Sequence, residues 1–356
     1  MTDGLKLTGY LGERQRSGSR FAAEEVLDLF AERRVAASVL LRGLSGFGAR
    51  HILRTDASLS LSEDPPIVLG AVDAAPVIAP LAAQVAEVMR RGLLTVERVR
   101  LLADGADEAG PTGGETVRFT VALGRNRRVD GVPAFSWVCD VLHRHEFDGA
   151  TAYLGVDGTA HGERRRARFF SRNVDVPLEI VAIGSAEQVT AVLPRLRERL
   201  HRPLFSTEPV QVCTCDGVLR ERPGPLPPVD AAGRPLWQKL TVYTTEDTLH
   251  DGAPIHRALI SRLREERAVG GTTVLRGVWG FHGQHRPRGD ALLQLGRRVP
   301  VATLMIDSPA RISAAFDLLE EVTGRHGLIT CETIPAALML DGTSRRGSLE
   351  LADYPG

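Results

Sequence analysis

The segment Leu40–His51, with the sequence LLRGLSGFGARH, decides the fold because a second version of it stands far along the chain. That version reads VLRGVWGFHGQHR at Val274–Arg286 and places Arg276 234 positions after Arg42, which is two periods of 117 residues. Self-similarity at a fixed period is the signature of tandem structural repeats. The pattern therefore predicts repeated units of about 117 residues.

A weaker version lies between these two. It reads YLGVDGTAHGERRR from Tyr153, and Gly155 and Gly158 stand where the outer versions have their first two motif glycines. A chain of 356 residues has room for three such units, and ordinary domain sizes favour two or three. We therefore predict three repeats, of which the middle one is the most altered.

Each repeat shows the same succession of apolar patterns. Alternating apolar and polar residues predict a first strand in LKLTGYLGE from Leu5, VRFTVALGR from Val117 and QKLTVYTTED from Gln238. An amphipathic helix follows, then a strand that runs into the glycine motif, a further strand, a second amphipathic helix and a short closing strand. This order predicts an α+β fold of three ferredoxin-like βαββαβ domains.

The third strand of each repeat indicates how the domains pack. The runs PIVLGAV, LEIVAI and VATLMI are almost continuously apolar, whereas a sheet with helices on one face only should alternate apolar and polar residues. The second face of each sheet is therefore expected to be buried. Three sheets packed around a pseudo-threefold axis, a single-chain pseudo-trimer, would achieve this; three domains on a string remain the alternative.

Composition shifts set the expected boundaries. The expected segments are 1–102 (first, best-preserved domain), 103–116 (linker), 117–215 (degenerate domain), 216–236 (Pro-rich linker), 237–340 (third domain) and 341–356 (tail).

The overall charge excludes some classes of function. Lys plus Arg and Asp plus Glu both total 44, so no global field steers the protein toward nucleic acid or an anionic membrane, and any anion site must be local. No stretch approaches the roughly 18 apolar residues needed to span a bilayer, and no signal-like segment opens the chain. We expect a cytoplasmic protein that does not span a membrane. Its four cysteines, Cys139, Cys213, Cys215 and Cys331, show no paired framework and are expected to be reduced.

The glycine motifs are the candidate ligand site. Their glycines let backbone amides approach an anion, and the neighbouring arginines and histidines add positive charge. A denser basic run, Arg164, Arg165, Arg166 and Arg168, takes this place in the middle repeat. The alternative is that the glycines only form the turn, the arginines are solvated and the phenylalanines pack in a core. The expected ligand-binding residues are Arg42, Gly43, Gly46, Phe47, Gly48 and His51 in the first repeat, and Arg276, Gly277, Gly280, Phe281 and His282 in the third.

Metal-binding and catalytic residues are harder to find. The pairs His282/His285 and His143/His145 lack a third Cys, Asp or Glu at ligand spacing, so no metal site is predicted. No P-loop, nucleophile elbow or GxGxxG motif after a strand is present in the sequence. We predict no catalytic residues. The alternative is a small-molecule enzyme that uses Glu13 or Glu246 with a loop histidine.

The first motif also carries a family resemblance. LLRGLSGFGARH, followed by LSEDPPIVLGAVD from Leu61, resembles the PII-like domain-of-unknown-function family 190 (DUF 190), whose copies read RGxxGFG before a flexible loop and LSxDLPV after it. It also resembles the PII nitrogen-regulatory signalling proteins. The third repeat departs by placing His282 at the last glycine, and the middle one by placing Leu154 at the arginine and Thr159 at the phenylalanine.

The resemblance implies a regulatory function rather than an enzyme. PII proteins are trimers that bind a small effector in clefts between subunits and present a loop to a target protein. By this resemblance the chain would bind a small anionic effector, with nucleotides among the candidates, and signal to a target such as a membrane transporter. It would act as a monomer, because one chain supplies all three units. The glycine-rich phosphate loop of PII proteins is missing from MRRGLLTVERV, HRPLFSTEPV and GRHGLITCET, so ATP binding in that manner is not implied and no cofactor is named.

Overall fold

A computed structural model describes residues 2–55, 64–102, 115–166, 175–283, 285–289 and 299–354. The protein is of mixed α and β structure with mostly antiparallel strands and, in the described residues, six helices.

The first repeat contains β1 (Thr2–Gly12), β2 (Arg16–Ser17), β3 (Arg20–Phe21), α1 (Ala22–Glu32), β4 (Ala37–Phe47), β5 (Arg54–Thr55), β6 (Pro66–Ala74), α2 (Ala75–Val88) and β7 (Arg91–Leu101). The second contains β8 (Thr116–Gly124), β9 (Arg128–Val129), β10 (Val132–Pro133), α3 (Ala134–Arg144), β11 (Gly149–Leu154), β12 (Thr159–Ala160), β13 (Glu163–Arg164), β14 (Pro177–Ser185), α4 (Ala186–Arg199), β15 (Leu204–Pro209), β16 (Gln211–Cys215) and β17 (Val218–Leu219). The third contains β18 (Trp237–Thr245), β19 (Leu249–His250), β20 (Ala253–Pro254), α5 (Ile255–Glu265), β21 (Thr272–Arg276), β22 (Trp279–His282), β23 (Arg288–Gly289), β24 (Pro300–Asp307), α6 (Pro309–Thr323), β25 (Leu328–Ile334), β26 (Ala336–Asp341) and β27 (Ser344–Ser348).

Within each repeat the long strands form an antiparallel sheet with both helices on one face. The strand order is β4–β6–β1–β7 in the first repeat, β11–β14–β8–β15 in the second and β21–β24–β18–β25 in the third. Apolar side chains at helical spacing hold each helix to its sheet; in α1 these are Val26, Leu27 and Phe30, all buried. In the described residues no helix is both long and apolar enough to cross a bilayer.

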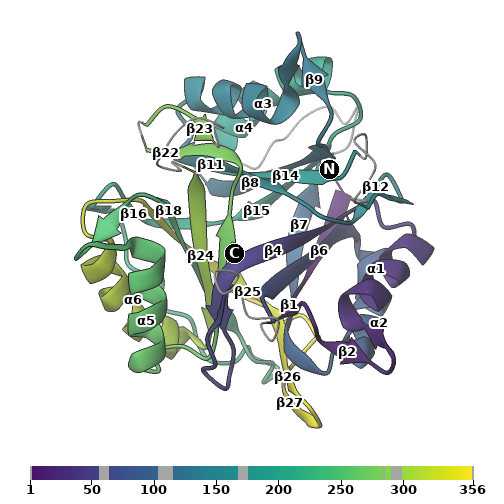
Figure 1. Cartoon of the computed structure of the whole chain (residues 1–356), viewed down its shortest axis with the longest axis vertical. Helices are drawn as coiled ribbons and strands as arrows, with labels where there is room; N and C mark the ends of the chain where they lie inside the picture. Colours follow the sequence, from purple (N-terminus) through teal and green to yellow (C-terminus); the bar gives the residue numbers. More distant parts are fainter. Residues whose placement is uncertain are drawn as a thin grey trace.

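The sheet face turned away from the helices is also buried. Val68 on β6, Val181 on β14 and Leu304 on β24 belong to one apolar cluster to which all three repeats contribute. Figure 1 shows the reason: the three helix pairs lie at the outside of the molecule and the strands fill its middle. The apolar runs of the third strands predicted this second buried face, and the prediction is confirmed.

Strand pairing joins the repeats to one another. β4 of the first repeat pairs with β21 of the third, β22 of the third with β11 of the second, and β12 of the second with β4 of the first. Three further strand pairs also join different repeats: β7 pairs with β15, β16 with β25, and β26 with β7. In the part of the chain that the structure describes, twenty-one strands thus form one continuous sheet in which each repeat is hydrogen-bonded to both others.

The segment expected as a tail is not loose in the structure. β26 and β27 form a hairpin, and β26 extends the edge of the first repeat's sheet by pairing with β7. Beyond it, Leu349 and Leu351 pack against the core of the first repeat and Ala352 is buried. The physical reason is apolar surface: residues 336–340, AALML, and the two later leucines cover a part of the first core that would otherwise face water.

Candidate functional site

The motif glycines lie where strands of neighbouring repeats approach closely. A Cβ on Gly46 would stand 2.4 Å from the Thr272 carbonyl oxygen, and one on Gly280 would stand 2.1 Å from that of Ala150. Gly158 in the middle repeat meets the first repeat in the same way. Contacts this short exclude any side chain, so these glycines permit pairing between repeats.

The motif phenylalanines fill the cores of neighbouring repeats. Phe47 of the first repeat is buried in the core of the third, and Phe281 of the third is buried in the core of the second. His51 stacks on Phe47 with ring centroids 5.3 Å apart. At the same place in the middle repeat Thr159 is buried, and its hydroxyl donates to the Val35 carbonyl at 2.9 Å. The motif is thus a connector between repeats.

The motif arginines are paired with the glutamates of the enzymatic alternative. Arg42 donates to Glu13 through Nε at 2.7 Å, and Arg276 forms the equivalent ion pair with Glu246. The adjoining glycines, Gly43 and Gly277, again lie against neighbouring strands, whereas Gly48 faces open space. The structure does not favour the enzymatic alternative, because both glutamates are held by arginines rather than placed beside a loop histidine.

The basic run of the middle repeat is largely neutralised. Arg164 bridges Asp157 and Asp28, and Arg166 pairs with Glu24 of the first repeat. Arg168 lies outside the described residues. This run therefore ties the second repeat to α1.

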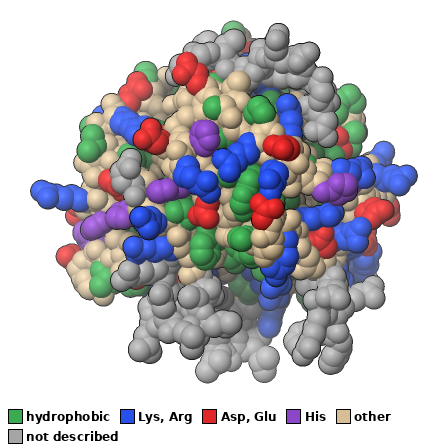
Figure 2. Space-filling view, turned by 90° about the horizontal axis from the view of Figure 1, so that it is seen from above, with side chains coloured by type: hydrophobic (Ala, Val, Ile, Leu, Met, Phe, Trp, Pro, Cys, Tyr) green, Lys and Arg blue, Asp and Glu red, His purple; other side chains and the backbone are tan. Residues whose placement is uncertain are grey.

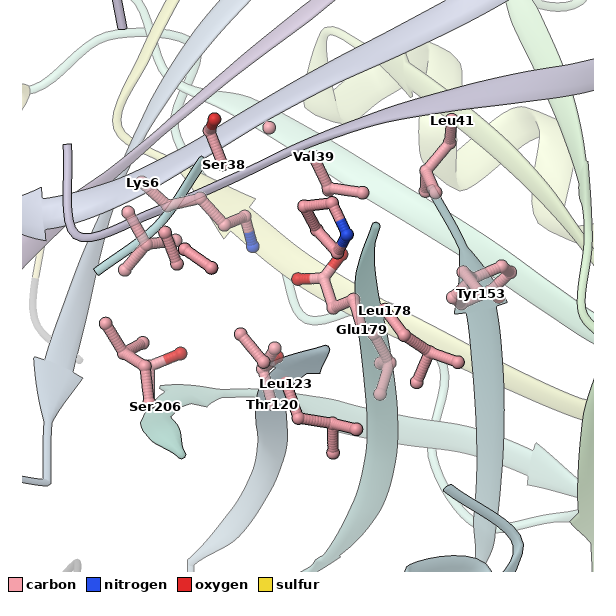
Figure 3. A pocket seen from close by; sticks show the side chains of 18 of the residues that line it. Lys6, Ser38, Val39, Leu41, Thr120, Leu123, Tyr153, Leu178, Glu179 and Ser206 are labelled. Atoms are coloured by element: carbon pink, nitrogen blue, oxygen red, sulfur yellow. The ribbon is translucent and has the colours of Figure 1, made fainter. Parts of the chain in front are cut away.

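A cavity lies between the first and second repeats. It measures about 280 Å³; β1, β4 and β6 line one side, β8, β11 and β14 the other, and β18 closes its inner end. Figure 3 shows Lys6, Thr120 and Glu179 turned toward this space, with Val39 and Leu178 supplying apolar wall. The cavity thus combines polar groups with an apolar surface, as small-molecule sites do.

Several polar atoms at the inner end of the cavity have no hydrogen-bond partner. A buried polar atom left unpaired costs about 1–3 kcal/mol, so such atoms favour a polar molecule in the space between them. These atoms are Thr8 Oγ1, Ser206 Oγ, Thr241 Oγ1 and Tyr243 Oη.

Buried ion pairs form the floor of the cavity. Lys6 pairs with Glu208, and Lys239 lies 2.7 Å from both Glu97 and Glu332. Burial alone would raise the pKa of Glu97, but the charges of Lys239 and Lys6 outweigh burial and lower it to about 2. Because these cations already have carboxylate partners, the floor offers hydrogen bonds rather than free positive charge.

Free positive charge lies instead at the mouth of the cavity. Arg127 and Arg165 are near Asp175 and Glu163, at 3.7 and 2.6 Å, but Arg202, His161 and His201 have no carboxylate partner among the described residues. Burial, and then the charges of Arg202 and Arg127, lower the pKa of His161, so this imidazole offers a hydrogen bond and Arg202 supplies the free charge. The mouth can therefore attract an anion. Elsewhere basic and acidic side chains interleave, as Figure 2 shows for the face seen from above.

A second cavity, of about 200 Å³, lies between the first and third repeats and contains Gly46, Phe47 and Gly48. Its basic residues are already paired: Arg50 and Arg91 with Asp341, and Arg54 with Asp64. An anion there would have to compete with carboxylates, so the first cavity is the better candidate site.

The junction of the second and third repeats contains His282. This side chain is buried, and its Nδ1 lies 3.5 Å from a carboxylate oxygen of Asp216. The glycine motif thus contributes differently to each of the three junctions.

Sequence reasoning missed the residues around the first cavity. They come from β1, β4, β6, β8, β14 and β18, and no local motif connects them. One signal was present: a basic residue interrupts the first strand of every repeat at an equivalent place, as Lys6, Arg118 and Lys239. A charge in the middle of a buried strand needs a partner and so indicates a site at the centre.

Comparison with known proteins agrees with the repeat pattern. The model of the DUF190 family, described as "Uncharacterized ACR", matches three times, at residues 4–101, 116–212 and 237–336. Among curated proteins the chain is similar to a UPF0166 protein from Aquifex aeolicus (strain VF5), with 35% identity over 96 residues, which is 27% of this chain and 88% of that protein. The relative is thus about the size of one repeat.

Proposed function

The chain belongs to the DUF190 family in three tandem copies, and from this premise we propose that it is a PII-like regulatory protein that binds a small anionic effector between its repeats. In this proposal one polypeptide supplies the three ferredoxin-like units that a PII-type trimer draws from separate subunits. The effector occupies the cavity between the first and second repeats. It has a phosphate or carboxylate end at the mouth and a less polar body inside, as a nucleotide has.

The cavity is the observation that carries this proposal. Its mouth presents Arg202, His161 and His201 without described carboxylate partners, and its inner end presents unpaired hydroxyls. Charge at the entrance favours the anionic end of a ligand, whereas Val39 and Leu178 inside favour an apolar or aromatic body.

The mouth of the cavity is directly connected in sequence to the segment that we propose to contact the target. Glu163 and Arg165 line the mouth, and the chain leads from them directly into residues 167–174, between the second and third long strands of the repeat. PII proteins present their target-binding loop from this place. An effector that contacts Arg165 would therefore act on the chain just before residues 167–174, and a protein target, with a membrane transporter as one candidate, would bind that segment.

A binding protein fits the side chains better than an enzyme does. Glu13 and Glu246 are held by arginines, and burial raises the pKa of Cys139, Cys213 and Cys331, so these thiols are poor nucleophiles. The four cysteines are also unpaired, which fits action in the reducing cytoplasm.

Thermal unfolding in the presence of single candidates tests the proposal. Nucleoside mono-, di- and triphosphates, cyclic nucleotides, phosphate and citrate are each added to the whole chain, and binders are then titrated by calorimetry. A ligand at 100 times its Kd adds about 2.7 kcal/mol to the free energy of unfolding and so raises Tm. The proposal fails if none of these anions raises Tm.

Two arginine variants locate the site. Arg202→Ala removes an exposed cation at the mouth, whereas Arg195→Ala removes one on α4 that lies over the Trp137 ring, away from the cavity. We expect Arg202→Ala to weaken binding at least tenfold and Arg195→Ala to leave it unchanged. Equal affinities in the two variants would place the ligand elsewhere and reject this site.

A further inference from the structure

The junction between the second and third repeats gathers three side chains that bind metals. Asp216 follows β16 at the end of the second repeat, and His282 and His285 lie at and beyond the end of β22 in the third. The two parts of the chain meet because β22 pairs with β11, and the Gly283 amide donates to the Asp148 carbonyl at 2.8 Å.

The spacing of the donor atoms suits a single ion. One carboxylate oxygen and one ring nitrogen from each histidine all lie within 4.8 Å of one another. His282 Nδ1 and Asp216 Oδ1 are 3.5 Å apart. With bonds of about 2.0–2.1 Å, two ligand atoms of a tetrahedral metal stand roughly 3.3 Å apart. The pair is thus near the separation that a shared ion requires and too far apart for a good hydrogen bond.

An unsatisfied buried atom points independently to a ligand. The His282 side chain is only 9% exposed, and its Nδ1 makes no hydrogen bond. Such an atom is costly unless something in the cluster binds it. The glycine at position 283 lets the Asp216 carboxylate lie close to this part of the chain: Gly283 has φ +55°, and a Cβ there would lie 1.8 Å from an Asp216 carboxylate oxygen.

The first and third repeats meet in an equivalent junction, in which the corresponding aspartate has different partners. Asp341 is the last residue of β26 and Asp216 directly follows β16, and each aspartate precedes a glycine. Asp341 is neutralised by Arg50, at 3.0 Å, and by Arg91. Asp216 has no arginine or lysine partner among the described residues and faces imidazoles instead.

Sequence alignment of the repeats shows further differences between the Asp341 junction and the Asp216 junction. His282 takes the place of Gly48, and His326, which acts electrostatically on Asp216, takes the place of Arg91. This junction thus has a histidine, His326, where the equivalent junction has the permanent cation Arg91.

We propose that Asp216, His282 and His285 bind a divalent transition-metal ion of borderline softness, such as Zn²⁺, at the junction of the second and third repeats. Two imidazoles and one carboxylate form a donor set that suits Zn²⁺ and leave a coordination position for water. The ion ties the chain that follows β22 to the end of the second repeat. This site is separate from the effector cavity and does not depend on the proposed function.

Metal titration of the whole, untagged chain tests this site. The protein is stripped with EDTA, dialysed, and titrated with ZnCl₂ against a chromophoric chelator; Co²⁺ is added separately, because its visible absorption reports a low coordination number. We expect one Zn²⁺ per chain and a Co²⁺ spectrum that Zn²⁺ abolishes. Binding should weaken in acid, because protons compete for the imidazoles.

Three variants make the test specific. Asp216→Asn and His285→Ala alter side chains that are partly or fully exposed, so the fold should survive, as circular dichroism would verify. Loss of a residue that merely supports a metal ligand weakens metal binding by about 10–100-fold, so loss of a ligand should weaken it at least tenfold. His250→Ala is the matched control, because His250 also lies 3.5 Å from an aspartate, Asp251, but has no second histidine there.

Two results would overturn the proposal. One is a wild-type chain that binds no more Zn²⁺ than Asp216→Asn does. The other is equal loss of affinity in His250→Ala and His285→Ala, which would indicate adventitious surface binding.

Discussion

Lys239 Nζ lies 2.7 Å from Glu97 Oε2, so a side chain of β18 in the third repeat forms an ion pair with a side chain of β7 in the first repeat. The same relationship closes a ring through the molecule. Each repeat supplies a cation from its first strand to a glutamate on β7, β15 or β25 of another repeat, and the other two pairs are Lys6 with Glu208 and Arg118 with Glu332. All six side chains are at most 12% exposed, so the ring fixes the order of the repeats around the centre.

Glu97→Gln should destabilise the protein strongly. The substitution keeps the shape of the side chain but leaves Lys239 and Lys6 with fewer buried counter-charges, and breaking a buried pair costs about 3–5 kcal/mol. Urea unfolding gives the change in free energy. The matched control is Glu87→Gln, which breaks the exposed pair with Arg345 at 3.0 Å and should cost less than about 1 kcal/mol. Similar losses in the two variants would contradict this account of the ring.

A methyl group at Gly46 should weaken the contact between the first and third repeats and so lower the free energy of unfolding. Gly46→Ala places a Cβ 2.4 Å from the Thr272 carbonyl oxygen, which must move, and overpacking of this kind costs about 1–3 kcal/mol. Gly48→Ala, two residues further on, meets nothing within 4 Å and should change stability by less than about 0.5 kcal/mol. The midpoint of urea unfolding distinguishes the two, and a harmless Gly46→Ala would show that β4 and β21 do not pair as closely as described.

The repeats and their strands could be predicted from the sequence because both depend on local periodicity. The spacing of the glycine motifs indicated the repeats, and the apolar run that contains Val68 indicated a sheet buried on both faces. The function of the motif glycines could not be predicted, since Gly46 and Gly280 contact strands of other repeats whose register no local pattern encodes. The cluster at His282 was missed for the same reason: its third member, Asp216, is 66 positions away in sequence and belongs to another repeat.

Truncating the two leucines after β27 should weaken the first repeat's core. Leu349 and Leu351 pack against that core although the sequence around them resembles a polar tail. Replacing both by alanine removes apolar contact worth roughly 1–3 kcal/mol. The control is the double variant of Leu219 and Leu249, which are 48% and 54% exposed and should tolerate alanine with little change. Calorimetry compares the Tm values, and equal values in the two double variants would show that the segment is not docked.

His256 should make the protein sensitive to mild acid. Burial, and then the charges of Arg257 and Arg276, lower the pKa of this histidine from 6.5 to about 4. Between these values the unfolded chain binds a proton that the folded chain does not, so stability is fully present above pH 6.5 and falls as the pH drops toward 4. His256→Leu removes this proton uptake, so its free energy of unfolding should fall less steeply over that window than that of the wild type. His250→Leu, at a half-exposed histidine, should keep the wild-type slope. Urea unfolding at intervals of half a pH unit measures the three slopes, and a His256→Leu slope equal to the wild-type one would assign the acid sensitivity to other groups.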